Sequence, residues 1–111
     1  MTDESETSFD VQRHDDTTNV RLVLSGDLDL YSAPALDDAL VAVEGEKWPV
    51  MVLDLRQLDF VDSAGLRLIM RTHARAKQDG RRLVLVRGGD AVQRVLAVTG
   101  LDRELEIVDR T

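Results

Sequence analysis

The 111-residue sequence contains no cysteine, which excludes disulfides, thiolate metal sites and thiol catalysis. Aromatic residues make up only 4% of it, so the stacking platforms that bind single-stranded nucleic acid are absent. Basic residues are also in deficit, and the formal net charge of -7 disfavours nucleic acid and anionic membrane surfaces, which both attract Lys and Arg. We therefore expect neither nucleic acid nor a membrane among the partners.

Long hydrophobic runs are missing as well. No segment approaches the roughly 20 apolar residues that a membrane-spanning helix needs. Residues 1–10 are polar and acidic, and they lack the basic start and apolar stretch of a signal peptide. These features, with the absence of cysteine, predict a soluble, cytoplasmic protein. The length and a hydrophobic content of 43% predict one domain with a modest core.

The N-terminal part of the sequence predicts a tail and a hairpin. Residues 1–8 have no apolar residue after Met1 and are predicted to be a disordered acidic tail, with the domain spanning residues 9–111. Apolar and polar residues alternate from Phe9 and again from Val20, which predicts two antiparallel strands joined by a turn at residues 15–19. Residues 26–31 are then expected to form a loop.

The rest of the sequence alternates between helix and strand patterns. The predicted elements are a helix capped by Ser32 and ending at Gly45, a buried strand over 50–55, a helix from Ser63 to Gly80, a strand over 83–86, a helix opened by the capping pair Asp90 and Gln93 and ending at Gly100, and a short strand at 105–107. This order predicts an α/β fold with a mixed, mostly parallel sheet of about five strands and helices packed against it.

The segment over residues 50–65, VMVLDLRQLDFVDSAG, carries the strongest functional signal. A buried strand leads into a loop and then into a helix N-terminus, and functional residues concentrate in such loops. Ser63 is predicted to be the helix N-cap, and Gly65 lets the backbone approach a neighbour closely. By spacing alone, a plain cap and a plain packing glycine are the more frequent explanation. The helix is expected to bury the stripe Leu66, Ile69, Met70, His73 and Ala74.

Three groups of residues, taken together, resemble a known family. They are Gly26-Asp27-Leu28-Asp29 with Ser32-Ala33-Pro34-Ala35-Leu36; Leu53-Asp54-Leu55 with Phe60-Val61-Asp62-Ser63-Ala64-Gly65-Leu66; and Leu83-Val84-Leu85-Val86 with Val95-Leu96 and Thr99-Gly100-Leu101-Asp102. In this order and at these intervals they resemble the STAS family, which includes bacterial anti-sigma-factor antagonists and the cytoplasmic domains of sulfate transporters. The similarity runs from about Phe9 to Val108, so it implies a single STAS-like domain.

The resemblance implies a function for Ser63. In the antagonist branch, the serine after the aspartate of an Asp-Ser-(Ser/Ala)-Gly motif is phosphorylated by an anti-sigma factor that is itself a serine kinase. Ser63 matches that serine, and Ala64 stands where many relatives carry a second one. The chain is thus expected to bind such a kinase, to lose that binding when Ser63 is phosphorylated, and to be reset by a serine phosphatase. No catalytic activity is expected.

A set of residues around Ser63 is expected to contact the partner: Asp27, Asp29, Ser32, Asp62, Ser63, Ala64, Gly65, Arg67 and Arg71. A phosphate adds about 1.5 to 2 negative charges, and a pair of like charges about 6 Å apart repels by roughly 2 to 3 kcal/mol at an effective dielectric near 20. Arg67, Arg71 and Arg75 recur every four residues and form one stripe. That stripe either borders the partner site or is an ordinary solvated face.

Two other functions compete with this interpretation. As an enzyme, the chain would use Ser63 as a nucleophile, but the Gly-x-Ser-x-Gly elbow and a neighbouring base are missing. A closer rival is a STAS scaffold or signalling subunit with a different protein partner. No cofactor is expected, because Gly88-Gly89-Asp90 matches neither Gly-x-Gly-x-x-Gly nor a P-loop. His14 and His73 lack companion ligands at metal spacing, so no metal site is expected.

Overall fold

A hairpin opens the fold, as the alternating pattern predicts. The computed structural model describes residues 8–111, and in it β1 (Phe9–Asp15) pairs antiparallel with β2 (Asn19–Leu28). Along β2, Val20, Leu22 and Leu24 are buried because they share the face that packs on the core. The predicted disordered tail lies outside the described residues except for Ser8, whose carbonyl accepts a hydrogen bond from the Asp27 N–H at 3.1 Å.

Three further strands complete the sheet. These are β3 (Val50–Val61), β4 (Arg82–Val86) and β5 (Glu106–Val108), and the strand order is β1-β2-β3-β4-β5. Every pair from β2 to β5 is parallel, so the prediction of a mixed, mostly parallel sheet of five strands is confirmed. The predicted buried strand is also confirmed, since residues 51–55 are buried on both faces of β3.

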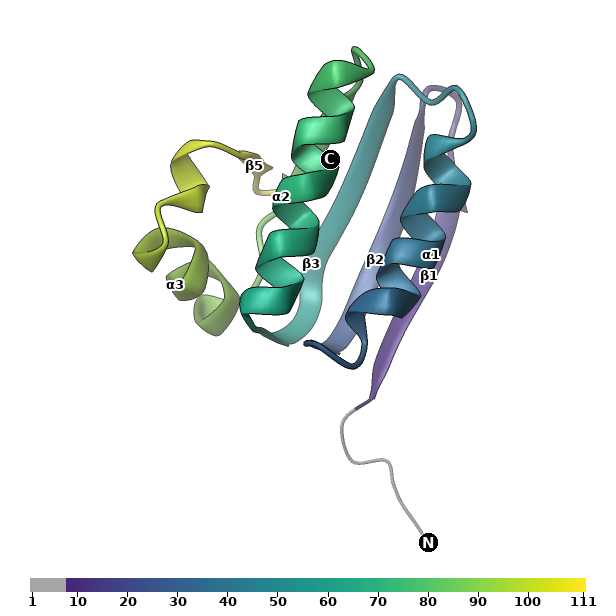
Figure 1. Cartoon of the computed structure of the whole chain (residues 1–111). Coiled ribbons are helices and arrows are strands. Elements are labelled where there is room, and N and C mark those ends of the chain that lie inside the picture. The colour runs from purple at the N-terminus through teal and green to yellow at the C-terminus, as the bar shows by residue number, and fades with distance from the viewer. Residues whose placement is uncertain (1–7) are drawn as a thin grey trace, which may run out of the picture.

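Helices connect the parallel strands. They are α1 (Ala33–Glu44), α2 (Ser63–Gln78) and α3 (Asp90–Val98), followed by the short 3-10 helix η1 (Leu101–Arg103). Figure 1 shows α1 and α2 side by side in front of the sheet, with α3 and η1 beyond α2. Fully buried leucines from β2, β3, α1 and α2 fill the space between sheet and helices. None of the helices within residues 8–111 has the length and hydropathy required to cross a membrane.

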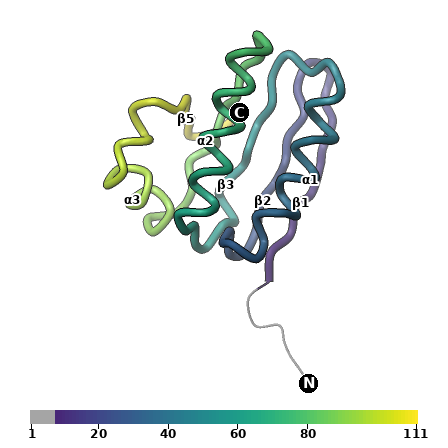
Figure 2. Tube along the Cα trace, in the orientation of Figure 1, coloured from purple at the N-terminus to yellow at the C-terminus, as the bar shows by residue number. Residues whose placement is uncertain are grey.

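Two predicted loops are shorter than expected. The structure continues β2 to Leu28 and β3 to Val61, where Asp27 pairs with Phe60 and Leu28 with Val61. The alternation of apolar and polar residues does not reveal this pairing, because the strand register shifts near Gly26, which has a positive φ of 88°. A left-handed residue breaks the alternation that identifies a strand. The ends of β2 and β3 therefore lie next to each other, immediately before α1 and α2 (Figure 2).

The buried face of α2 is rotated from the predicted stripe. Leu66 and Ile69 are buried as expected, but Ala74 is exposed and Met70 and His73 are only half-buried. Leu68, Thr72 and Ala76 are buried instead, because α2 packs against α1 as well as against the sheet. Thr72 satisfies its hydroxyl by donating to the Leu68 carbonyl at 2.8 Å.

The predicted capping pair of α3 is also wrong in detail. The N-cap is Gly89, and Asp90 is the first helical residue. Gln93 does reach back over the helix start, where its side-chain oxygen accepts the Gly88 N–H at 2.8 Å. In a capping box the glutamine side chain accepts the N–H of the N-cap residue. Here Gln93 accepts the N–H of Gly88, the residue before the N-cap.

Candidate functional site

Ser63 lies at the start of α2, but it is not the N-cap. The cap is Asp62, whose backbone is extended and whose Oδ1 accepts the Gly65 N–H at 3.0 Å. Aspartate caps helices as well as serine does, and a cap residue needs an extended backbone. Asp62 has that backbone, so it occupies the N-cap position. Ser63 becomes the first helical residue, with an exposed side chain. Its hydroxyl makes no side-chain hydrogen bond within residues 8–111, so the helix does not depend on it.

Asp62 also joins the two loops of the site. Its second carboxylate oxygen, Oδ2, accepts the Leu30 N–H at 3.2 Å, and its own N–H donates to the Leu28 carbonyl at 3.0 Å. One side chain thus fixes the loop after β2 relative to the first turn of α2. This positioning role explains the aspartate of the Asp-Ser motif without any contact to a partner.

Asp29 and Ser32 shape the loop before α1. Asp29 Oδ1 accepts the N–H groups of Tyr31 at 2.9 Å and of Ser32 at 3.0 Å. The Ser32 hydroxyl accepts the Asp29 N–H at 2.9 Å and donates to the Asp27 carbonyl at 2.7 Å. Ser32 occupies the predicted N-cap position of α1, but its hydroxyl makes no capping bond to that helix. Its hydrogen bonds instead make the loop rigid.

Gly65 is buried where α2 meets the ends of β2 and β3. A Cβ atom built on it would come within 2.8 Å of both Leu28 Cγ and Val61 Cγ2, and 3.0 Å from the Leu28 carbonyl oxygen. At those distances a side chain fits only if the helix or its neighbours move, so the expected close approach is confirmed. Gly65 allows α2 to sit low on the sheet and thereby sets the height of Ser63 above it.

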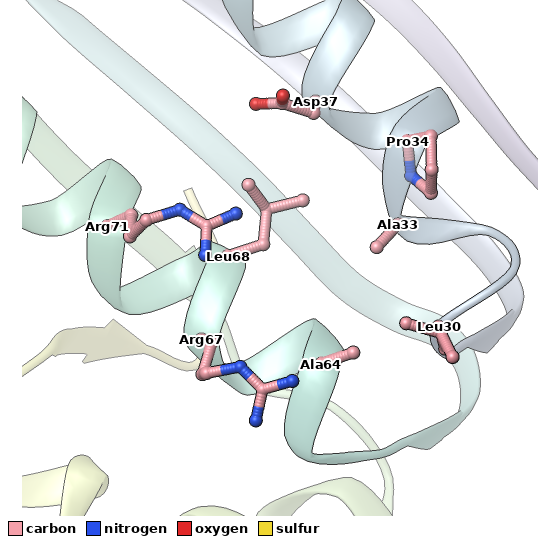
Figure 3. Close-up of a pocket in the computed structure, with 8 residues that line it drawn as sticks. All are labelled: Leu30, Ala33, Pro34, Asp37, Ala64, Arg67, Leu68 and Arg71. Carbon is pink, nitrogen blue, oxygen red and sulfur yellow. The ribbon is translucent and has the colours of Figure 1, made fainter.

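Two hollows flank the exposed ridge of α2. The first has a volume of about 310 Å³ and lies between α1 and α2 (Figure 3), lined by Leu30, Ala33, Pro34, Asp37, Ala64, Arg67, Leu68 and Arg71. The second has a volume of about 510 Å³ and lies between α2 and the end of α3, lined by Ser63, Leu66, Arg67, Met70, Arg71, Thr99 and Leu101. Arg67 and Arg71 line both hollows, so they stand on the ridge that separates them.

The remaining predicted residues face another hollow. Asp27, Asp29 and Ser32 line a space of about 220 Å³ with Phe9, Tyr31 and Ala35. The structure therefore separates the predicted site into two neighbouring surfaces. One holds Ser63 with the two arginines, and the other holds the acidic loop. Asp62 connects the two surfaces through its bonds to Leu30 and Gly65.

Sequence reasoning missed the exposed apolar residues around this end of the molecule. Tyr31 is 89% exposed and Leu30 is 63% exposed, both in the loop that Asp62 holds, and Phe60 is 48% exposed at the end of β3. Large apolar side chains kept in water beside a rigid loop are typical of protein interaction surfaces. The only available signal was their occurrence in segments otherwise rich in aspartate.

Comparison with known proteins gives consistent similarities. A family model described as "Mlab, STAS domain" matches residues 10–109. The anti-sigma-B factor antagonist of Listeria monocytogenes is 29% identical over 92 residues, which cover 83% of this chain and 81% of that protein. The crystal structure of an anti-sigma factor antagonist from Mycobacterium paratuberculosis superposes with a TM-score of 0.80 at 30% identity, covering 92% of this chain and 86% of that one.

A further similarity concerns the fold alone. The anti-sigma factor antagonist SpoIIAA in its unphosphorylated form has a TM-score of 0.75 at 20% identity, covering 89% of this chain and 88% of its own. The SpoIIAA architecture therefore matches the five-stranded sheet and helices described above.

Proposed function

The chain belongs to the STAS domain family, and from this membership we propose that it is a cytoplasmic anti-sigma-factor antagonist. In this proposal it binds an anti-sigma factor that has serine kinase activity. Phosphorylation of Ser63 by that kinase ends the complex, and a serine phosphatase restores it. The similarity to proteins named anti-sigma factor antagonists in Listeria and Mycobacterium supports the class of partner.

The observation that supports the phosphorylation step is the exposed hydroxyl of Ser63, for which residues 8–111 supply no hydrogen-bond partner. Asp62 takes over the capping role, so a kinase can modify Ser63 without removing a hydrogen bond that the helix needs. Asp62 joins the first turn of α2 to the loop shaped by Asp29 and Ser32, so the backbone at Ser63 has a defined position. A protein kinase needs an accessible hydroxyl that its catalytic base can orient for attack on the phosphate, and the exposed Ser63 side chain meets that need.

A phosphate on Ser63 changes binding by charge rather than by unfolding. It adds about 1.5 to 2 negative charges, while the N-terminus of α2 favours it by only about 0.3 to 1 kcal/mol. Even one unit of that charge repels a partner carboxylate about 6 Å away by roughly 2 to 3 kcal/mol at an effective dielectric near 20. That penalty weakens binding by about 30- to 150-fold. Because Asp62 still caps α2, the fold itself is expected to stay intact.

We propose a regulatory role rather than a catalytic one. A serine nucleophile needs a base within hydrogen-bond reach. His73 is the histidine nearest in sequence, and it lies ten residues along α2, which corresponds to about 15 Å of helix axis. The residue before Ser63 is Asp62, and both of its carboxylate oxygens already accept backbone N–H groups. Asp62 is therefore not available as the base that a serine nucleophile needs.

The test is a pull-down from cell extract with the wild-type chain and with Ser63→Asp, followed by mass spectrometry and by titration calorimetry with the recovered kinase. We expect wild type and Ser63→Ala to bind, and Ser63→Asp to bind at least about 10-fold more weakly, because a carboxylate carries less charge than a phosphate.

A matched control is Thr17→Asp, which adds the same charge at the exposed β1–β2 turn, at the other end of the sheet from Ser63. Binding of the kinase by Ser63→Asp at wild-type strength would contradict the switch. Recovery of a different class of partner with the wild type would identify a STAS scaffold instead.

A further inference from the structure

The hollow between α2 and the end of α3 combines an apolar floor with positive charge. Leu66, Met70 and Leu101 supply apolar surface, and Ser63 lies on the rim. The charged residues of its lining are Arg67 and Arg71, with no carboxylate among the described residues that form it. In a chain with a net charge of -7, this groove is a local region of opposite sign. We call it the α2–η1 groove.

The two arginines of the groove are not used by the fold. Within residues 8–111, neither Arg67 nor Arg71 has a carboxylate within salt-bridge distance, whereas Arg75, one turn further along, pairs with Glu44 at 3.0 Å. Most other arginines that the structure describes also have acidic partners: Arg13, Arg21, Arg56, Arg81, Arg82 and Arg87. A guanidinium left free beside an apolar floor is suited to a carboxylate from outside the chain.

We propose that the α2–η1 groove binds an acidic segment of the partner that also carries a large apolar side chain. The apolar side chain packs on Leu66, Met70 and Leu101, and a neighbouring carboxylate pairs with Arg67 or Arg71. Charge complementarity selects this occupant over a basic segment, which the two arginines repel. The inference deepens the proposed function and rests on it, because the partner is the anti-sigma kinase.

The position of Ser63 gives the groove its own response to phosphorylation. Ser63 and Arg67 are four residues apart on α2, so their side chains are neighbours on the helix surface. A phosphate on Ser63 can accept paired hydrogen bonds from the Arg67 guanidinium. The phosphate then occupies Arg67 in place of the partner carboxylate. Phosphorylation thus removes an attraction as well as adding a repulsion.

Binding of the recovered kinase to full-length variants tests the groove. We expect Arg67→Glu and Met70→Glu to weaken binding by about 10-fold or more, since each places a carboxylate against an acidic segment. Matched controls are Val41→Glu on α1, where Val41 is 60% exposed, and Arg94→Glu on the exposed side of α3, neither of which lines the groove. The controls should bind within about twofold of wild type.

The outcomes separate the two proposals. Normal binding by both groove variants, together with loss of binding by Ser63→Asp, overturns the groove and leaves the proposed function standing. Absence of a kinase from the wild-type pull-down overturns the proposed function and the groove with it. Thermal melts show whether each variant is folded, and Arg67→Glu alters an exposed side chain, so it reports on the groove even if Met70→Glu is unstable.

A second measurement needs no partner. Phosphoserine is encoded at position 63 of the full chain, and its pKa, ordinarily about 6, is followed by ³¹P NMR. The charged groups that face it are Arg67 and Arg71, which line the same groove, and Asp62, the preceding residue in the chain. We expect Arg67→Gln to raise the phosphate pKa by roughly half a pH unit and Arg94→Gln to leave it unchanged. An unchanged titration in Arg67→Gln overturns the pairing.

Discussion

The two halves of α2 differ in how they use the same residue type. Arg67, Arg71 and Arg75 recur at one spacing, yet only Arg75 is tied into the fold, where it contacts Glu44 at 3.0 Å and Asp37 at 4.0 Å on α1. The turn after α2 is tied to the same helix end, because Arg81 donates to the Glu44 carbonyl at 2.7 Å. The C-terminal half of α2 is therefore a structural contact between two helices.

The N-terminal half of α2 shows the reverse arrangement. Its carboxylate, Asp62, bonds to backbone N–H groups, and its arginines remain exposed between two hollows. Charges that satisfy each other stabilise a fold, and charges held apart from any partner remain available for binding. The difference indicates that one end of α2 is an anchor and the other is an interaction surface, and three pairs of substitutions test it.

The largest effect is expected from Gly65→Ala, which alters how the N-terminal half sits on the sheet. The new Cβ would lie 2.8 Å from Leu28 Cγ and from Val61 Cγ2, so the helix start has to move. Overpacking of this kind costs about 1 to 3 kcal/mol, partly offset by the better helix propensity of alanine. We expect a Tm several degrees lower in a thermal melt followed by circular dichroism.

Gly45→Ala is the matched control for that change, at the anchored end of the neighbouring helix. A Cβ there has its nearest neighbours at 3.6 Å, and the backbone φ of -72° suits alanine. Its stability should be unchanged or slightly higher. Equal stability of Gly65→Ala and wild type would show that the helix start can shift freely, and that the position of Ser63 is not fixed by packing.

A smaller effect is expected from Asp62→Ala, which removes the cap and its link to the loop after β2. The Gly65 and Leu30 N–H groups both lose their acceptor, and the loss of an aspartate cap costs about 1 kcal/mol. Amide hydrogen exchange should accelerate at these two residues while the C-terminal half of α2 keeps its protection. Asp62→Asn keeps one acceptor oxygen, which can still cap the Gly65 N–H, but it places an amide nitrogen against the Leu30 N–H, so exchange should accelerate mainly at Leu30. If both residues exchange as fast as in the alanine variant, the negative charge matters more than the hydrogen bonds.

The fold could be predicted from the sequence where one signal dominated. Alternation gave the hairpin, and the continuous apolar run gave the strand buried on both faces. Predictions failed where two residues compete for one role. Asp62 and Ser63 are adjacent and both cap helices well, and only the extended backbone at Asp62 decides between them. Gly26 concealed the end of β2 because its left-handed conformation shifts the register.

The candidate site was predictable as residues but not as surfaces. Ser63, Arg67 and Arg71 could be grouped because they share one helix. Leu101 could not be added to them, since it is thirty or more residues away in sequence and reaches the groove only through the packing of η1 beside α2. The separation of the acidic loop from the arginines also depends on tertiary packing, which no local pattern encodes.

The smallest effect comes from the arginines themselves. Arg75→Gln leaves the half-buried Glu44 carboxylate without its partner and should lower the free energy of unfolding by up to about 1 kcal/mol, less at high salt. Arg71→Gln removes no ion pair of the fold, so its stability should stay within about 0.5 kcal/mol of wild type. Urea denaturation at two salt concentrations measures both. Equal losses of unfolding free energy in the two variants would contradict the comparison. Arg71 would then stabilise the fold as Arg75 does, and its charge would not be free for a partner.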